Sequence, residues 1–171
     1  MEHISKNDRS MIFKSGFLLI GLSVLSLALL FYIYYEGLAF MVEIWDTREE
    51  YGHGYIIPFI AGFLIWQKSD VLSETEFAGA WAGVLFTILG IALYYAGELS
   101  SIYTLIQYGF LIAVFGVVLS ALGYSAFRII LVPLIILFFM IPFPNFLLNN
   151  ISSQLQLISS EISVFFIRLF D

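Results

Sequence analysis

The sequence contains no cysteine, only two histidines and only four prolines among its 171 residues. The missing cysteine excludes disulfides, thiolate metal sites and cysteine nucleophiles within these residues. Charged residues make up 12% of the chain, about half of the roughly 25% that soluble domains carry. The net charge of −6 is unlike the basic surfaces of nucleic-acid-binding proteins, so we expect no nucleic-acid partner.

What the sequence holds instead is apolar: 61% of its residues are hydrophobic and 18% are aromatic. The apolar residues come in blocks, and a helix that crosses a membrane needs about 20 of them. We therefore predict an all-α, polytopic integral membrane helix bundle with five to six transmembrane helices, surrounded by the lipid bilayer. The expected spans are residues 17–35, 52–66, 79–97, 102–122 and 129–141, followed by a last helix over residues 146–170.

Short polar breaks set the predicted organisation, a single transmembrane domain over residues 1–171. Residues 98–101 only just separate the third and fourth spans, which makes these spans a helical hairpin. The fifth span stops at Pro142-Phe143-Pro144, because two missing N–H donors prevent the helix from continuing undisturbed. The last segment places apolar residues three and four apart, the pattern of one helical stripe. Its serine-rich side suits close helix packing, the border of a wet cavity or a position along the membrane interface.

Lysine and arginine placement predicts the orientation, because cytoplasmic loops carry an excess of both residues. With the N-terminus cytoplasmic, five of them lie inside and only Arg48 lies outside. We then expect residues 1–14 to form a short cytoplasmic segment and the acidic loop over residues 36–50 to face outward. The five inside residues are Lys6, Arg9, Lys14, Lys68 and Arg128.

His53 stands between two glycines where the second expected span begins. It could act as a general base, a metal ligand or a substrate contact, but no positioned nucleophile or second ligand stands near it in the sequence. The alternative is an interfacial residue that hydrogen-bonds at the helix start, with Gly52 and Gly54 letting the backbone turn. We expect no catalytic residue, cofactor or metal site in this chain. His53 and Gly54 remain candidates for substrate approach or for a structural role.

The last helix contributes three more candidates of the same kind, Gln156, Glu161 and Arg168. Glu161 and Arg168 are seven residues apart, which places them on nearly the same face. They could form an intramembrane ion pair that marks a functional cavity. Alternatively, Arg168 extends to the interface and Glu161 stays in water. Several aromatic residues near the expected span ends are typical of interface belts, among them Trp45, Trp66 and Trp81.

Two segments together resemble the exosortase/archaeosortase family. Residues 53–68, "HGYIIPFIAGFLIWQK", have a His-Gly pair opening a span, a proline soon after, and a tryptophan with a basic residue closing it. Residues 140–170, "MIPFPNFLLNNISSQLQLISSEISVFFIRLF", have a P-x-P break followed by a Leu-Gln-Leu-x-Ser-Ser type of helix. The number and order of the expected spans between them also fit. The resemblance is to the N-terminal portion of a family member.

The resemblance implies a multi-pass protein of the cell inner membrane that processes sorting signals at the C-termini of protein substrates, in bacteria that export exopolysaccharide. The chemistry proposed for the family is cysteine-dependent cleavage or transpeptidation, in which an arginine and a histidine of later spans assist. Because this chain has no cysteine, we expect a truncated or partial member. Two alternatives stay open: a non-catalytic scaffold subunit that binds a second membrane chain, and a small transporter built on Pro133, the Pro142-Phe143-Pro144 break and Glu161 with Arg168.

Overall fold

The structure is a computed structural model, which describes residues 21–75, 78–143 and 145–170. Every regular element in these residues is an α-helix or a 3₁₀ helix, and no strand occurs among them. The predicted all-α class is therefore confirmed. The chain divides into two compact units, Met1–Ile141 and Pro142–Asp171, and the division falls at the expected Pro142-Phe143-Pro144 break.

Two described helices are long and apolar enough to cross a membrane. They are α5 (Trp81–Ser100) and the continuous helical segment Tyr103–Met140. A third span results if the helix Gly21–Ile33 and α2 (Tyr35–Thr47), which meet at an angle of 67°, count as one crossing. The expected five to six spans are therefore not confirmed.

The difference has two physical reasons. The expected fourth and fifth spans belong to one element, α6 (Tyr103–Ile136), which is extended by the 3₁₀ helix η2 (Leu137–Met140). The expected second span is α3 (Ile56–Gln67), which has only 12 residues. Such a helix is about 18 Å long, well short of the roughly 30 Å hydrocarbon core of a bilayer.

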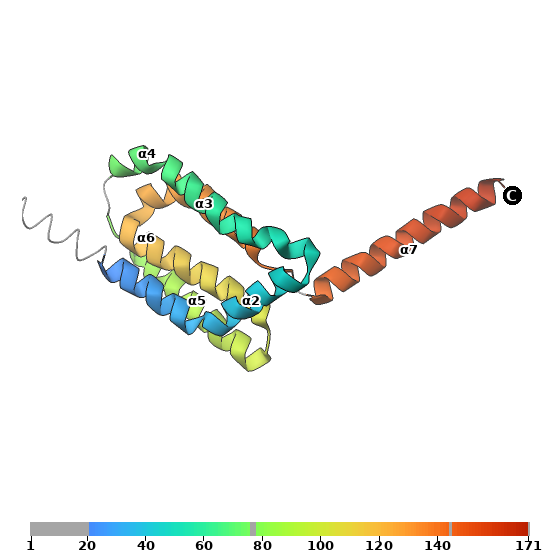
Figure 1. The fold of residues 1–171 in the computed structure, drawn as a ribbon, viewed down its shortest axis with the longest axis horizontal. Helices are drawn as coiled ribbons and strands as arrows, with labels where there is room; N and C mark the ends of the chain where they lie inside the picture. The colour runs from blue at the N-terminus through green and yellow to red at the C-terminus, as the bar shows by residue number, and fades with distance from the viewer. Residues whose placement is uncertain (1–20, 76–77, 144, 171) are drawn as a thin grey trace, which may run out of the picture. The chain divides into compact units, whose positions relative to one another are not determined.

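Glycines join α5 and α6 into the expected antiparallel hairpin (Figure 1). Each helix carries a buried glycine every seven residues. A Cβ added to Gly90 would lie 2.6 Å from the Gly109 carbonyl oxygen and 2.7 Å from the Ala113 Cβ, so there is no room for a side chain. Small residues of this kind let membrane helices approach closely. The two series are Gly83, Gly90 and Gly97 on α5, and Gly109, Gly116 and Gly123 on α6.

Gly123 divides α6 into two arms, residues 103–122 and 124–136. Its φ of 79° and ψ of 179° are not helical, and an added Cβ would collide with the backbone carbonyl of Ala78. Glycine is needed there for both reasons. The second arm and η2 pack against α3 (Figure 1). The expected boundary between the fourth and fifth spans thus exists, as a bend.

The core of the first unit lies where the helix Gly21–Ile33 and α2 pack on α6. The ring of Phe110 is 5.1 Å from that of Phe31 and 5.6 Å from that of Tyr34, both edge-on. These aromatic contacts hold the N-terminal helix pair on the first arm of α6. The buried core residues are Leu30, Tyr34, Met41, Trp45, Ile57, Ile106, Phe110, Leu111, Ala113, Val117, Met140 and Ile141.

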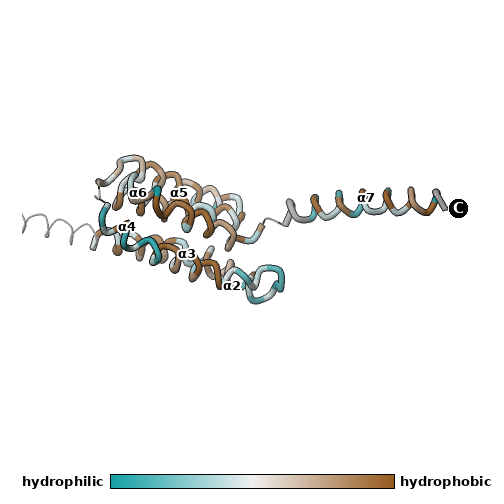
Figure 2. Tube along the Cα trace, turned by 90° about the horizontal axis from the view of Figure 1, so that it is seen from above, coloured by the Kyte–Doolittle hydropathy of each residue, from teal (hydrophilic) through white to brown (hydrophobic). Residues whose placement is uncertain are grey.

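Polar segments lie at the two opposite ends of α3. The 3₁₀ helix η1 (Glu49–Tyr55) precedes α3 and the short helix α4 (Ser69–Ser73) follows it, and both are hydrophilic in Figure 2. Five charged residues, four of them acidic, lie at the η1 end: Glu43, Asp46, Arg48, Glu49 and Glu50. Lys68 lies at the other end, together with Asp70 and Glu74. The orientation stays a prediction, and residues 1–14 lie outside the described residues.

The second unit is one helix, α7 (Asn145–Phe170), of 26 residues. Polar and apolar residues alternate along it (Figure 2), and it is not among the described helices apolar enough to cross a membrane by length and composition. Within the described side chains, the expected apolar stripe includes Ile151, Leu155, Ile158 and Ile162, all of which are exposed.

Candidate functional site

The first motif segment begins as a 3₁₀ helix. η1 runs into α3 without a break, and the N-cap residue of α3 is Tyr55. The expected start of the second span at residue 52 therefore differs from the structure: Gly52-His53-Gly54 belong to the end of η1, and α3 begins at Ile56. The turn already has helical hydrogen bonding, since the N–H of Ile56 donates to the carbonyl of His53. His53 and Gly52 are exposed, whereas Gly54 is buried.

Gly54 is buried because the indole of Trp45 lies directly against it, and an added Cβ would overlap the ring. The indole Nε1–H donates a hydrogen bond of 2.9 Å to the backbone carbonyl of Met140. Met140 is the last residue of η2 and opens the second motif segment. The two motif segments are far apart in the sequence, yet they meet at one side chain. We call Trp45, Gly54 and Met140 the Trp45 anchor.

Burial separates Trp45 from the other two tryptophans. Trp45 is only 8% exposed, whereas Trp66 is 70% exposed and Trp81 is 87% exposed. Trp66 and Trp81 are exposed, as residues of an interface belt would be, whereas Trp45 packs inside the protein. A buried indole N–H needs a hydrogen-bond partner, and the Met140 carbonyl, 95 positions further along the chain, supplies it.

Tyr55 extends the Trp45 anchor toward the surface. Its ring packs edge-on against the indole with centroids 4.9 Å apart, and its hydroxyl donates a 2.7 Å hydrogen bond to Asp46 Oδ1. That hydrogen bond raises the pKa of the Tyr55 hydroxyl, and desolvation and the Asp46 charge act in the same direction. Because the folded state favours the protonated phenol, this contribution to stability is complete below the unfolded pKa of about 10 and is lost as the pH rises through the folded pKa.

We expect Asp46→Ala to lower the pKa of Tyr55 toward its ordinary value, because the acceptor of the Tyr55 hydrogen bond is removed. The measurement is the pH titration of the ¹³Cζ signal in protein with labelled tyrosine, assigned with Tyr55→Phe. The matched control Glu49→Gln removes a nearby exposed charge and should leave this titration unchanged. A Tyr55 pKa that is the same in Asp46→Ala and the unmodified protein would contradict the assignment.

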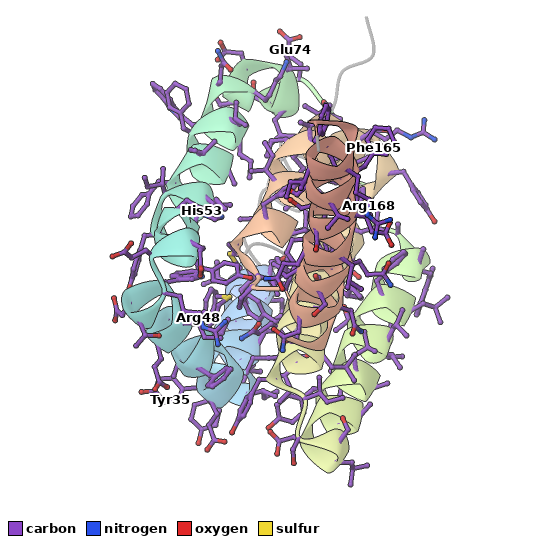
Figure 3. The ribbon with its side chains drawn as sticks, turned by 90° about the vertical axis from the view of Figure 1, so that its right-hand side faces the viewer. Tyr35, Arg48, His53, Glu74, Phe165 and Arg168 are labelled. Atoms are coloured by element: carbon purple, nitrogen blue, oxygen red, sulfur yellow. The ribbon has the colours of Figure 1, made fainter. Side chains whose placement is uncertain are left out.

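His53 is an exposed imidazole on a rigidly supported turn. Its ring lies 6.4 Å from that of Tyr51, and Figure 3 shows His53 and Arg48 on the segment between α2 and α3. In the part of the chain that the structure describes, no group of three or more His, Cys, Asp or Glu side chains could hold a metal ion. Gly54, the residue after His53, packs against Trp45 and so holds the turn in place. The geometry suits an imidazole that hydrogen-bonds to a molecule arriving from solvent.

On α7, Glu161 and Arg168 lie on one face, as their spacing predicts. Together with Ser160, Val164 and Phe165 they border a shallow groove of about 320 Å³, and Figure 3 labels Phe165 and Arg168 on this helix. Gln156 precedes Glu161 by five residues, about 140° around the helix, and does not border the groove. The groove belongs to a single helix and has both polar and apolar walls.

The structure thus brings His53 and Gly54 together on η1, and Glu161 and Arg168 together on α7. Sequence reasoning missed the packing role of the glycines, although their seven-residue spacing was a readable signal. It also missed Trp45 and Gln107, which bond to backbone carbonyls 95 and 70 positions away. Patterns of neighbouring residues cannot predict contacts between residues so far apart in the sequence.

A glycine-packed hairpin of long apolar helices defines the class of the chain, a helical integral membrane protein. A family model described as transmembrane exosortase matches residues 45–171, which is most of the chain and begins at Trp45. The protein belongs to the transmembrane exosortase family, as the two motif segments indicated. No curated protein and no solved structure matches it significantly.

Proposed function

We propose that this chain forms membrane-embedded scaffolding of an exosortase that processes C-terminal sorting signals of exported proteins at the outer face of the inner membrane. The family match over residues 45–171 carries the proposal. The Trp45 anchor supports it, because it fixes the His53 turn to the start of the second motif segment. The proposed orientation places the N-terminus in the cytoplasm and the η1 end outside, where the substrate's sorting signal arrives. The proposed link to exopolysaccharide export rests on family membership alone.

The nucleophile of the proposed reaction comes from outside these 171 residues, because none of them is a cysteine. A cysteine thiolate attacks a peptide carbonyl of the substrate and expels the amine, and water or a second amine then releases the acyl group. In this scheme the chain holds the substrate at the bilayer surface. His53 contacts the substrate near the scissile segment, because it is exposed beside the anchored turn.

We expect His53→Ala to slow sorting-signal processing by about fivefold, the effect of losing one substrate hydrogen bond of ordinary strength. The chain's gene is deleted in its native host and restored with each variant, and conversion of a reporter carrying a native sorting signal is followed by immunoblot. Membrane levels of His53→Ala should match those of the unmodified chain, because the side chain is exposed.

The matched control is Glu74→Gln, an exposed substitution beyond α4, at the other end of α3. It should process the reporter at the normal rate. Normal processing by His53→Ala would remove the substrate contact and leave η1 with a structural role. Normal processing in the deletion strain itself would refute the proposed function.

A non-catalytic subunit that binds a second membrane chain is the second candidate, favoured by the absence of cysteine from the sequence. Purification of the tagged chain from native membranes distinguishes the two. The first candidate requires a cysteine-containing exosortase segment in the product, in the same polypeptide or bound to it. A stable complex whose partner lacks an exosortase motif, together with normal reporter processing in the deletion strain, supports the second.

A further inference from the structure

α2 lies like a strap between two parts of the first unit. Near its start, Gly37 packs on Ile106 of α6 so closely that an added Cβ would be 2.6 Å from the Ile106 Cγ2. Near its end, Trp45 donates to the carbonyl of Met140. The ring of Phe40 stacks on that of Tyr103 with centroids 4.3 Å apart. The strap therefore covers the first turn of α6 and reaches the end of η2.

The strap leaves the preceding helix at Tyr34 with a bend of 67°. Sharp bends usually come from proline, Gly/Ser pairs, π-bulges or a side chain that enters the backbone ladder. Residues 21–47 contain no proline, and the backbone bonds on both sides of Tyr34 are intact, at 2.9 Å to Leu30 and 3.0 Å from Leu38. The bend falls at Tyr34, whose backbone angles of φ −91° and ψ 9° are not helical, and contacts with α6 lie directly beside it.

One of these contacts is polar. The buried Gln107 side chain of α6 donates through Nε2 to the Gly37 carbonyl, at 3.2 Å. This bond adds a side-chain donor to the helical ladder one turn after the bend and links α6 to the strap.

Two buried polar atoms at the bend have no hydrogen-bond partner, the Tyr34 hydroxyl and the Gln107 Oε1. Tyr34 is fully buried and Gln107 is 2% exposed. Each such group keeps its desolvation cost in the closed arrangement and recovers its hydrogen bonds when water reaches it. The closed arrangement of the strap therefore carries a desolvation cost at its pivot.

We infer that α2 is a movable strap that pivots at Tyr34, and that the Gln107 side chain is the latch that holds it closed on α6. Opening lifts Gly37 from Ile106 and gives water access to the start of α6. The inference does not depend on the proposed function, because it concerns the access of solvent and not the turnover of a substrate.

The absence of native cysteine lets single cysteines report opening. Ile106→Cys places a thiol directly beneath Gly37, and its reaction with a membrane-impermeant maleimide is timed on the whole chain in liposomes. We expect slow labelling, which Gln107→Leu accelerates by up to about fivefold, because the lost Nε2 bond to the Gly37 carbonyl outweighs the relief of the unpaired Oε1. Gln107→Met, which keeps the length of the side chain, should give the same acceleration.

Two controls make the outcome decisive. Leu99→Cys, 90% exposed at the end of α5, sets the rate for an open thiol. Leu119→Cys is 3% exposed on the same arm of α6, more than three turns from Gln107, and should stay protected in every variant. Unchanged Ile106→Cys labelling in both Gln107 variants overturns the inference. An equal acceleration at Leu119→Cys also overturns it, because it would show general loosening rather than movement of the strap.

Discussion

Replacing Gly90 by leucine is expected to separate the α5–α6 hairpin and to prevent the protein from folding into a single state. A Cβ at this position meets the Gly109 carbonyl oxygen at 2.6 Å and the Ala113 backbone nitrogen at 2.7 Å. Overpacking of side chains costs about 1–3 kcal/mol. Here the obstructing atoms include backbone that cannot rotate away, so we expect a loss of at least about 3 kcal/mol.

The measurement is an SDS titration in mixed micelles, with helix content followed by circular dichroism and dispersity by size-exclusion chromatography. Gly62→Leu is the matched control, because an added Cβ there meets nothing within 4 Å, and it should unfold like the unmodified protein. If Gly90→Leu unfolded at the same SDS fraction as Gly62→Leu, the close glycine contact would not be what holds α5 and α6 together.

Trp45→Ala is expected to cost about 3–5 kcal/mol, the usual range for removing a buried large aromatic side chain. The substitution leaves a cavity against Gly54 and removes the donor to the Met140 carbonyl. Because Trp45 joins η1 to η2, the loss should also free the His53 turn. Limited proteolysis of residues 48–55 should therefore speed up in parallel with the fall in stability.

Two further variants serve as comparisons for Trp45→Ala. Trp45→Phe keeps one aromatic ring but loses the hydrogen bond and part of the indole packing, so it should cost at least about 1–3 kcal/mol, the penalty for an orphaned buried acceptor, and less than Trp45→Ala. Trp81→Ala removes a tryptophan that is 87% exposed and should change stability by less than about 0.5 kcal/mol. Equal losses for Trp45→Ala and Trp81→Ala would contradict the anchor.

The two substitutions affect the candidate site by different routes. Gly90 packs on the first arm of α6, and α6 carries the residues that contact the strap. Trp45 touches the His53 turn itself. We therefore expect Trp45→Ala to impair the proposed processing reaction as strongly as His53→Ala, by displacing the turn.

The sequence by itself determined the class and the coarse organisation of the protein. Long apolar runs determine a membrane helix bundle, because backbone polar groups in lipid must be satisfied within the segment. The break at Pro142-Phe143-Pro144 and the hairpin around residues 98–101 were also predictable, since both depend on neighbouring residues. The family likewise followed from two motif segments, and the match over residues 45–171 agrees with it.

The tertiary structure decided what depends on residues distant in the sequence. Hydropathy assigned a separate span to residues 129–141, but the structure joins them to α6 across a bend that only Gly123, pressed against Ala78, can adopt. The bend at Tyr34 lies beside the contacts of Gly37 with Gln107 and Ile106, residues 70 and 69 positions further along the chain.

The same holds for the candidate site. The sequence singled out His53, whose exposure fits a surface contact, yet the residue that organises the site is Trp45. Its partners are Gly54, nine positions on, and Met140, 95 positions on. Local patterns report how one segment meets water or lipid, whereas burial of an indole N–H depends on which distant carbonyl the fold brings to it.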